Sequence, residues 1–218
     1  RWTDKEGNLW LFGGVTLVDG VAHRLNDLWK YTPSTGMWTW VHGDSTFGFY
    51  RGVYGQRGVP AAANKPGGRS NSPVTWVDIN GKLWLFGGYG YAESTGTDTT
   101  GYLNDVWRYD PVTNEWTWMF GSKTGIATLS TGPAGTYTGL GMVGTPGART
   151  VAAGWVDGQG NFWFLGGTGT TNVTASNFRN DFWKLEAVVP PTPAQPGLFT
   201  AGKPSVCIGE TNVTYTVP

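Results

Sequence analysis

The chain has 218 residues, enough for one large domain or two modest ones. Glycine is abundant at 35 residues, aromatic residues make up 15% and charged residues only 14%, which is typical of short strands and tight turns rather than of helical bundles or disordered segments. The 15 basic and 15 acidic residues cancel and are mixed along the chain, so no basic stripe is present for nucleic acid, and no apolar run reaches the roughly 18–20 residues that span a bilayer.

Four short strands are predicted in the middle of the chain. The first ends at Thr75–Asp78 (TWVD), and a glycine-containing turn leads to the second, Leu83–Gly88 (LWLFGG), whose apolar residues predict burial on both faces. The third is Leu103–Asp110 (LNDVWRYD). A proline-containing turn leads to the fourth, Glu115–Met119 (EWTWM), whose alternation predicts one covered face and one freer face.

This four-strand pattern recurs along the chain, and the tryptophans show the recurrence most clearly. All 13 tryptophans fall into three matching sets, Trp2, Trp10, Trp29, Trp38 and Trp40, then Trp76, Trp84, Trp107, Trp116 and Trp118, then Trp155, Trp163 and Trp183. A Gly-Gly pair follows each second strand, and an Asn-Asp pair lies shortly before a tryptophan of each third strand. Self-similarity at a regular interval indicates a repeat architecture.

The Gly-Gly pair after an apolar strand, followed by Asn-Asp-x-Trp-x-Tyr and a further Trp nine residues on, resembles the kelch repeat over Arg1 to about Glu186. The resemblance implies an all-β propeller of four-stranded antiparallel blades, and this chain would hold its last three. Because a buried Trp covers roughly 150–250 Å², regularly placed aromatics favour packing between blades. We therefore expect a structural role for Trp10, Trp29, Trp84, Trp107, Trp163, Trp183, Asp27, Asp105 and Asp181.

The third repeat has no Trp-Thr-Trp strand; its third strand ends in FWKLEAVV, and prolines follow. Closed propellers often complete one blade with strands from both ends of the chain. We expect a segment upstream of Arg1 to supply the missing strand; the alternative is that the strand was lost and its edge is covered otherwise. Three blades cannot close a ring, so earlier blades of the same chain, or a partner, would complete it.

The C-terminal part predicts a linker and the start of another module. Residues 188–197 form a Pro-rich, semi-rigid connector after a propeller segment of residues 1–187. Residues 198–218 resemble the opening of the PKD-like or immunoglobulin-like β-sandwich modules of large bacterial surface proteins, which implies a secreted or cell-surface location. Cys207 either pairs with a cysteine beyond Pro218 or stays a buried thiol.

The long connections between strands are expected on one face of the propeller, where long loops on a rigid scaffold usually bind ligands. These predicted loops are Val15–Arg24, Tyr89–Tyr102, Thr168–Phe178, Gly43–Gly68 and Gly121–Gly147. Aromatic side chains among small polar residues suit sugar rings or a protein partner, and the candidates are Phe47, Phe49, Tyr50, Tyr89, Tyr91 and Tyr102. Alternatively, the loops merely cover one another.

Part of the long linker before each first strand is itself repeated, which favours a scaffold role for Tyr54, Tyr137, Arg69 and Arg149. Both arginines are expected to pair with the Asn-Asp carboxylates in exposed, weak ion pairs.

No catalytic, metal or cofactor site is predicted. The galactose-oxidase-like copper enzymes, which share the kelch fold, need two histidines, tyrosine ligands and a Tyr–Cys crosslink. Here His23 and His42 lie in different connections and Cys207 lies outside the propeller segment. Most aspartates occupy repeat positions, and no partner is evident for the loop carboxylates Asp19, Asp44, Glu93 and Asp98.

We therefore expect a non-catalytic extracellular binding or adhesion module that recognises a glycan or a protein at the long-loop face, without nucleic acid and without membrane insertion. Two alternatives remain open. One is a secreted carbohydrate-active enzyme with its catalytic residues in the missing blades, and the other is a structural subunit of a surface assembly.

Overall fold

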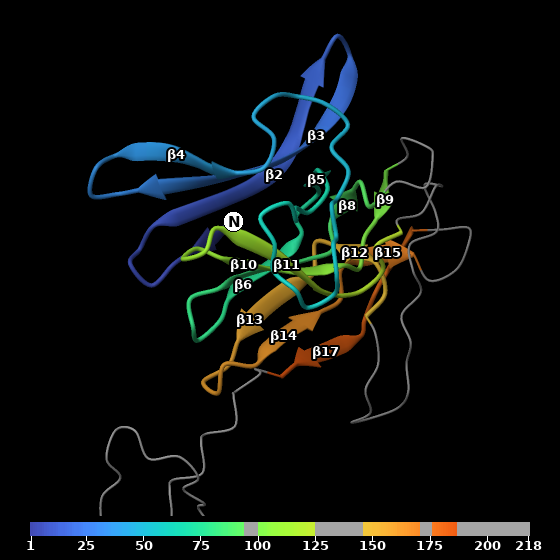
Figure 1. Ribbon diagram of the computed structural model, residues 1–218. Helices are drawn as coiled ribbons and strands as arrows, with labels where there is room; N and C mark the ends of the chain where they lie inside the picture. The colour runs from blue at the N-terminus through green and yellow to red at the C-terminus, as the bar shows by residue number, and fades with distance from the viewer. Residues whose placement is uncertain (94–99, 125–145, 171–175, 187–218) are drawn as a thin grey trace, which may run out of the picture. The chain divides into compact units, whose positions relative to one another are not determined.

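A computed structural model describes residues 1–93, 100–124, 146–170 and 176–186 (Figure 1). The chain divides into two compact units, Arg1–Glu186 and Ala187–Pro218, and every described residue belongs to the first. The described residues form strands joined by turns, so the all-β class is confirmed. None of them forms a helix that is long and apolar enough to cross a membrane. The predicted linker 188–197, the predicted module 198–218 and Cys207 lie outside the described residues.

Three antiparallel sheets follow one another along the first unit, coloured blue, green and orange in Figure 1. Repeat 1 is a four-stranded sheet of β1 (Trp2–Thr3), β2 (Leu9–Val18), β3 (Val21–Thr32) and β4 (Met37–His42). Repeat 2 is a four-stranded sheet of β6 (Val74–Val77), β7 (Leu83–Phe86), β10 (Val106–Asp110) and β11 (Glu115–Phe120). Repeat 3 has three strands in the described part of the chain, β13 (Ala153–Val156), β14 (Phe162–Leu165) and β17 (Phe182–Leu185).

The spacing of the tryptophans sets the register of these sheets. Eight residues separate the first two tryptophans of each repeat, and this spacing places them directly opposite each other, as in the pair Trp76↔Trp84. Trp2↔Trp10 and Trp155↔Trp163 pair in the same way. The predicted division of each repeat into short antiparallel strands is therefore confirmed.

An aspartate closes the first turn of every repeat. In repeat 2 the Oδ1 atom of Asp78 accepts hydrogen bonds from the backbone N–H groups of Asn80 and Lys82, at 2.8 and 2.9 Å. Its Oδ2 atom accepts the indole N–H of Trp84, at 2.8 Å. Asp4 and Asp157 hold their own turns and tryptophans with the same geometry. The repeated carboxylates of these turns thus hold the hairpin in shape.

Neighbouring sheets pack face to face through large apolar side chains. Trp10 and Phe12 of repeat 1 lie in one buried cluster with Leu83 and Leu85 of repeat 2. On the other side of repeat 2, a second cluster brings Trp84 and Phe86 together with Phe162 and Phe164 of repeat 3. The interleaved side chains therefore come from strands more than 70 residues apart.

Burial of the second strand on both faces is confirmed only in repeat 2, where all four residues of β7 are buried. In β2 the residues alternate, and Leu9 and Leu11 are 41% and 43% exposed. In β14, Leu165 is 46% exposed. The reason is that only repeat 2 has a described neighbour on each face.

The connections between second and third strands are not plain loops, which corrects the sequence analysis. In repeat 1, β2 and β3 continue as one long hairpin to a turn at Asp19-Gly20. The other two repeats form small three-stranded sheets instead, β5 (Arg69–Ser70) with β8 (Tyr89–Gly90) and β9 (Gly101–Tyr102), and β12 (Arg149–Thr150) with β15 (Thr168–Thr170) and β16 (Ser176–Phe178).

The Gly-Gly pair allows this continuation. The ladder between β2 and β3 shifts register at Phe12/Gly14, and Gly13 has φ +63°, a backbone conformation that favours glycine. A Cβ atom on Gly13 would lie 2.6 and 2.7 Å from the carbonyl oxygens of Leu25 and Arg69. The pair therefore makes a tightly packed bulge from which the strands emerge in a new direction.

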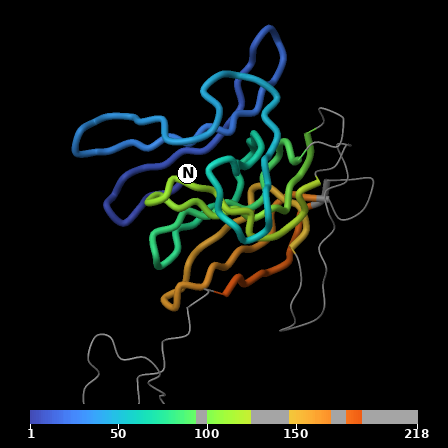
Figure 2. The backbone as a smooth tube through the Cα atoms, in the orientation of Figure 1, coloured from blue at the N-terminus to red at the C-terminus, as the bar shows by residue number. Residues whose placement is uncertain are grey.

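The linker of residues 43–68 does not lie wholly on the long-loop face, contrary to expectation. Figure 2 shows it passing from repeat 1 to repeat 2. Its middle part runs along the outer edge of β11, where Gly58 N–H donates to the carbonyl of Trp118 at 2.8 Å and the side chain of Asn64 donates to the carbonyl of Trp116 at 3.0 Å. This segment satisfies backbone groups that a sheet edge would otherwise expose. Most of the corresponding linker, residues 121–147, lies outside the described residues.

Candidate binding face

A buried ion pair holds together the segments that lead to the candidate binding face. The guanidinium of Arg69, on β5, donates to both carboxylate oxygens of Asp105 at 2.8 Å. The indole N–H of Trp107 donates to the same carboxylate at 2.7 Å. Both side chains of the ion pair are fully buried, so the prediction of an exposed pair is wrong, although the partners are the expected ones.

Repeat 3 contains the same arrangement. Arg149 donates to the carboxylate oxygens of Asp181 at 2.6 and 2.7 Å, and Trp183 donates to it at 2.6 Å. Each arginine also donates to two glycine carbonyls, one in the linker and one in the Gly-Gly pair, as Arg69 does to Gly67 and Gly87. The ion pair therefore connects the linker, the bulge and the third strand.

Tyr54 completes the buried group in repeat 2. Its hydroxyl donates to the carboxylate of Asp105 at 2.7 Å, and its ring lies 4.7 Å from that of Trp107. Burial, together with the Asp105 carboxylate, raises the pKa of Tyr54 well above its ordinary value. For Arg69, burial lowers the pKa, but the carboxylate more than offsets this and holds the pKa above its usual range. The hydroxyl thus stays protonated and the pair charged.

Aromatic rings from the β2–β3 hairpin, from the linker, and from β8 and β9 lie near this ion pair. We call this group the aromatic face, and it consists of His23, Phe47, Phe49, Tyr89, Tyr91 and Tyr102. His23 comes from β3, the two phenylalanines from the linker, and the tyrosines from β8, β9 and the residue after β8. Five of the six residues predicted from sequence as ligand contacts are in this group.

Ring contacts connect four members of the group, and Tyr89 and Tyr102 form a separate pair. The His23 ring lies 5.8 Å from the Phe47 ring and 4.9 Å from the Phe49 ring. Phe49 in turn meets Tyr91 edge to face at 6.0 Å. His23 is not among the residues predicted from sequence as ligand contacts, although it lies in the predicted loop Val15–Arg24.

The members of the aromatic face differ in exposure. Phe47 and Phe49 are 59% and 46% exposed, whereas Tyr89 and Tyr91 are only 9% and 3% exposed. The prediction that all six rings offer a surface to a ligand is therefore corrected for these two tyrosines. They form the floor of the face, and the phenylalanines form its accessible part. The sixth predicted residue, Tyr50, has its hydroxyl 2.6 Å from the hydroxyl of Thr46, beside the face.

A cation lies at the edge of the aromatic face. The guanidinium carbon of Arg24 is 4.7 Å from the centre of the Tyr89 ring, within the range of a cation–π contact. The Nε atom of Arg24 and the Nδ1 atom of His23 are both buried, and neither has a hydrogen-bond partner among the described residues. A buried polar atom without a partner costs free energy.

Gly67 and Gly68 allow the linker to pack closely against Arg24 on β3 and Tyr91 after β8. A Cβ atom on Gly68 would overlap the carbonyl oxygen of Arg24, and one on Gly67 would overlap the carbonyl oxygen of Tyr91. The Pro-Gly-Gly-Arg sequence therefore brings the linker against both hairpins and leads directly into Arg69. The small residue type is the only sequence signal for this contact.

Two loop carboxylates have partners that the sequence did not reveal. Asp44 pairs with Lys65 at 2.8 Å and accepts a hydrogen bond from Asn26. Glu93 pairs with Lys123 at 2.9 Å. Asp98 lies outside the described residues. In the part of the chain that the structure describes, no three His, Cys, Asp or Glu side chains cluster as metal ligands.

Comparison with known proteins gives two matches. A family model described as the kelch motif matches residues 79–117, which include β7, β10 and the start of β11. A curated protein named N-acetylneuraminate epimerase, from Pasteurella multocida (strain Pm70), is 40% identical over 55 residues. That segment is 25% of this chain and 13% of the relative, so the chain spans only a small part of the relative's length. The residues that match the kelch motif lie in repeat 2, whose four-stranded sheet contains β7, β10 and β11.

Proposed function

We propose that this chain is a non-catalytic binding module that recognises a glycan or a protein at the aromatic face. The observation that supports the proposal best is that two half-exposed phenylalanines pack beside His23, while Arg24, the next residue along β3, lies over the ring of Tyr89. Exposed aromatic rings stack on the apolar faces of sugars or side chains, and an arginine at their edge adds directed donors.

The rigid support below the face favours binding over a purely structural role. Arg69 and its buried ion pair fix the linker from which Phe47 and Phe49 project, and Gly68 fixes its distance from Arg24. A site held in place before the ligand arrives loses less conformational entropy on binding. We also propose, from the sequence, that the module acts in a secreted or cell-surface protein.

An acidic sugar is the ligand class that we favour among glycans. The protein with 40% identity over 55 residues is named for N-acetylneuraminate, a carboxylated sugar, and Arg24 would pair with a carboxylate through charge-assisted hydrogen bonds. The same name keeps open a second candidate function, that of an enzyme acting on such a sugar. It would need catalytic residues beyond those in the described ranges.

The experiment is a glycan array followed by titration of the bound sugars, with the Phe47→Ala/Phe49→Ala double variant beside the original chain. We expect affinity to fall at least tenfold, because the accessible rings are lost while the buried floor remains. Phe182→Ala is the matched control, since this phenylalanine is 54% exposed on β17, away from the face. Tyr89→Ala and Tyr91→Ala are unsuitable because both rings are buried. Equal binding by the double variant and the control would contradict the proposal.

A further inference from the structure

His42 is the last residue of β4 and comes directly before the linker that carries Phe47 and Phe49. Its side chain is half-buried, and its ring lies 6.2 Å from the ring of Tyr109 on β10. The Nδ1 atom of His42 accepts a hydrogen bond from the backbone N–H of Gly43 at 2.8 Å. A ring nitrogen that carries a proton cannot accept, so this contact requires the imidazole to be neutral.

Asp44 anchors the linker just after this contact. The side-chain amide of Asn26, on β3, donates to the Asp44 carboxylate at 2.8 Å, and the Asp44 backbone N–H donates to the Asn26 side-chain oxygen at 3.0 Å. The ammonium of Lys65 donates to both carboxylate oxygens at 2.8 Å. Between His42 and Asp44, a Cβ atom on Gly43 would overlap the carbonyl oxygen of Asn26. The linker therefore leaves β4 through a closely packed turn.

The segment that presents the two phenylalanines is held at both of its ends. Asp44 holds the first end, and at the second end the carbonyl of Tyr50 accepts a hydrogen bond from Gly68 at 2.7 Å. Phe47 and Phe49 lie between these two anchors. Release of the turn at Gly43 would therefore leave them held firmly at one end only.

The charges around His42 oppose its protonation. Burial is the largest cause that lowers the pKa of His42, and Lys65 lowers it further, whereas Asp44 raises it. Burial, together with Asp110, raises the pKa of Tyr109, so the tyrosine hydroxyl stays uncharged in neutral and mildly acidic solution. Because the folded chain binds the histidine proton less tightly than the unfolded chain, the neutral imidazole stabilises the fold above about pH 6.5, and this contribution is lost as the pH falls further.

Repeat 2 contains the same turn. Gly121 has φ +88°, against +90° for Gly43. The backbone N–H of Ser122 donates to the side-chain oxygen of Asn104 at 3.0 Å, as that of Asp44 does to its own asparagine. Serine takes the place of the aspartate here, so the turn can form without a carboxylate.

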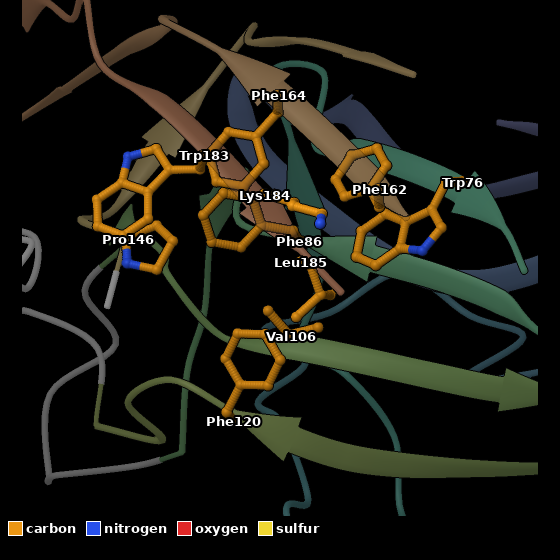
Figure 3. A pocket seen from close by; sticks show the side chains of 10 residues that line it. All are labelled: Trp76, Phe86, Val106, Phe120, Pro146, Phe162, Phe164, Trp183, Lys184 and Leu185. Carbon is orange, nitrogen blue, oxygen red and sulfur yellow. The ribbon is translucent and has the colours of Figure 1, made fainter. Parts of the chain in front are cut away.

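The position of His42 is apolar in repeat 2. His42 lies opposite Leu28 between β3 and β4, and Phe120 lies opposite Val106 between β10 and β11. In Figure 3, Phe120 lies beside Val106 among the apolar side chains that line a pocket between repeats 2 and 3. Phenylalanine thus fits this position, and the histidine of repeat 1 adds a titratable group that the turn does not need.

We propose that His42 is a pH-sensitive latch of the aromatic face, whose protonation in mild acid releases the turn at Gly43 and loosens the segment that carries Phe47 and Phe49. A proton on Nδ1 places two donors opposite each other, and the new charge repels Lys65. The inference rests on the function proposed for the aromatic face and adds its regulation. A ligand bound near neutral pH would be released in a mildly acidic compartment.

The first experiment measures hydrogen exchange of the Gly43 and Asp44 amides at about pH 7 and about pH 5, with each rate divided by the intrinsic rate at that pH. We expect the original chain to lose protection at least about threefold at the lower pH. His42→Phe should keep its protection, because phenylalanine fits the same position in repeat 2. His23→Phe is the matched control and should respond like the original chain, since the chain has two histidines.

A second variant keeps the proposal testable if His42→Phe does not fold. Lys65→Gln removes the cation that opposes protonation, so the midpoint of the exchange response should move to higher pH. The second experiment titrates glucuronate, an acidic sugar, at both pH values. Its affinity should fall at least about threefold at the lower pH in the original chain and should not fall in His42→Phe.

Four outcomes would overturn the latch. They are equal protection of the original chain at both pH values, an equal loss of protection in His42→Phe, disappearance of the response in His23→Phe, and an unshifted midpoint in Lys65→Gln. Equal glucuronate affinity at both pH values would overturn the release of ligand. If glucuronate binds at neither pH, the acidic-sugar proposal fails, and hydrogen exchange, which needs no ligand, still decides whether His42 controls the segment.

Discussion

Arg69 and Asp105 form a fully buried ion pair with two parallel hydrogen bonds of 2.8 Å. The two residues are 36 positions apart, and the contact joins the end of a long linker to the start of a third strand. Trp107, Tyr54 and two glycine carbonyls complete their hydrogen bonds. Since a buried charge needs such complete pairing, this pair fixes the position of the linker.

Arg69→Ala should therefore destabilise the fold strongly. Removal of one partner leaves the Asp105 carboxylate buried without its cation, and we expect a loss of about 3–5 kcal/mol in the free energy of unfolding. Lys65→Ala is the control, because its pair with Asp44 has side chains 27% and 26% exposed and should contribute about 1 kcal/mol or less. Urea unfolding followed by circular dichroism measures the free energy of unfolding of both variants. Similar losses would show that the buried ion pair contributes no more to stability than the half-exposed pair.

Alkaline pH should reveal the role of Tyr54. Its pKa is raised in the folded chain, by burial and by the Asp105 carboxylate, so folding favours the protonated hydroxyl. That contribution is fully present below the ordinary tyrosine pKa of about 10 and is lost as pH rises toward the folded pKa. We expect the free energy of unfolding to fall above about pH 10, and to fall less steeply in Tyr54→Phe. Parallel curves for the two proteins from pH 8 to 11 would contradict this assignment.

Two leucines at equivalent positions should differ sharply in their contribution to stability. Leu85 on β7 is fully buried, whereas Leu11 on β2 is 43% exposed. Leu85→Ala should cost about 2–5 kcal/mol, because it leaves a cavity between repeats 1 and 2. Leu11→Ala should cost less than about 1 kcal/mol. Equal losses in chemical denaturation would mean that the outer face of repeat 1 is covered in solution.

Gly68→Ala should disturb the aromatic face without touching any of its rings. The added Cβ would overlap the Arg24 carbonyl oxygen and push the linker away from the β2–β3 hairpin. We expect a loss of about 1–3 kcal/mol and a higher exchange rate for the amides of residues 47–50. Gly158→Ala has no atom within 4 Å of its added Cβ and should change stability by about 0.5 kcal/mol at most. Equal changes in stability and exchange for the two variants would show that the packing of Gly68 against Arg24 does not hold the linker in place.

The sequence predicts most residues of the aromatic face but not which of them are exposed. Residue type and loop position predict Phe47 and Phe49 as ligand contacts, and both form the accessible part of the face. Tyr89 and Tyr91 have the same residue type and a similar position but are buried, because Arg24 packs over Tyr89 and Phe49 of the linker packs against Tyr91. Composition cannot separate the two cases, since the difference depends on a segment about 40 residues away.

The repeat and its division into short antiparallel strands are evident from the sequence. These depend on the residue spacing within one hairpin, as the eight residues from Trp76 to Trp84 illustrate, and such local geometry is read directly along the chain. Only the tertiary structure shows that Arg69 is buried and that the linker lies along the edge of β11. Each of these results depends on which segments become neighbours in space, and the free energy of burial is set by those neighbours rather than by the residue that is buried.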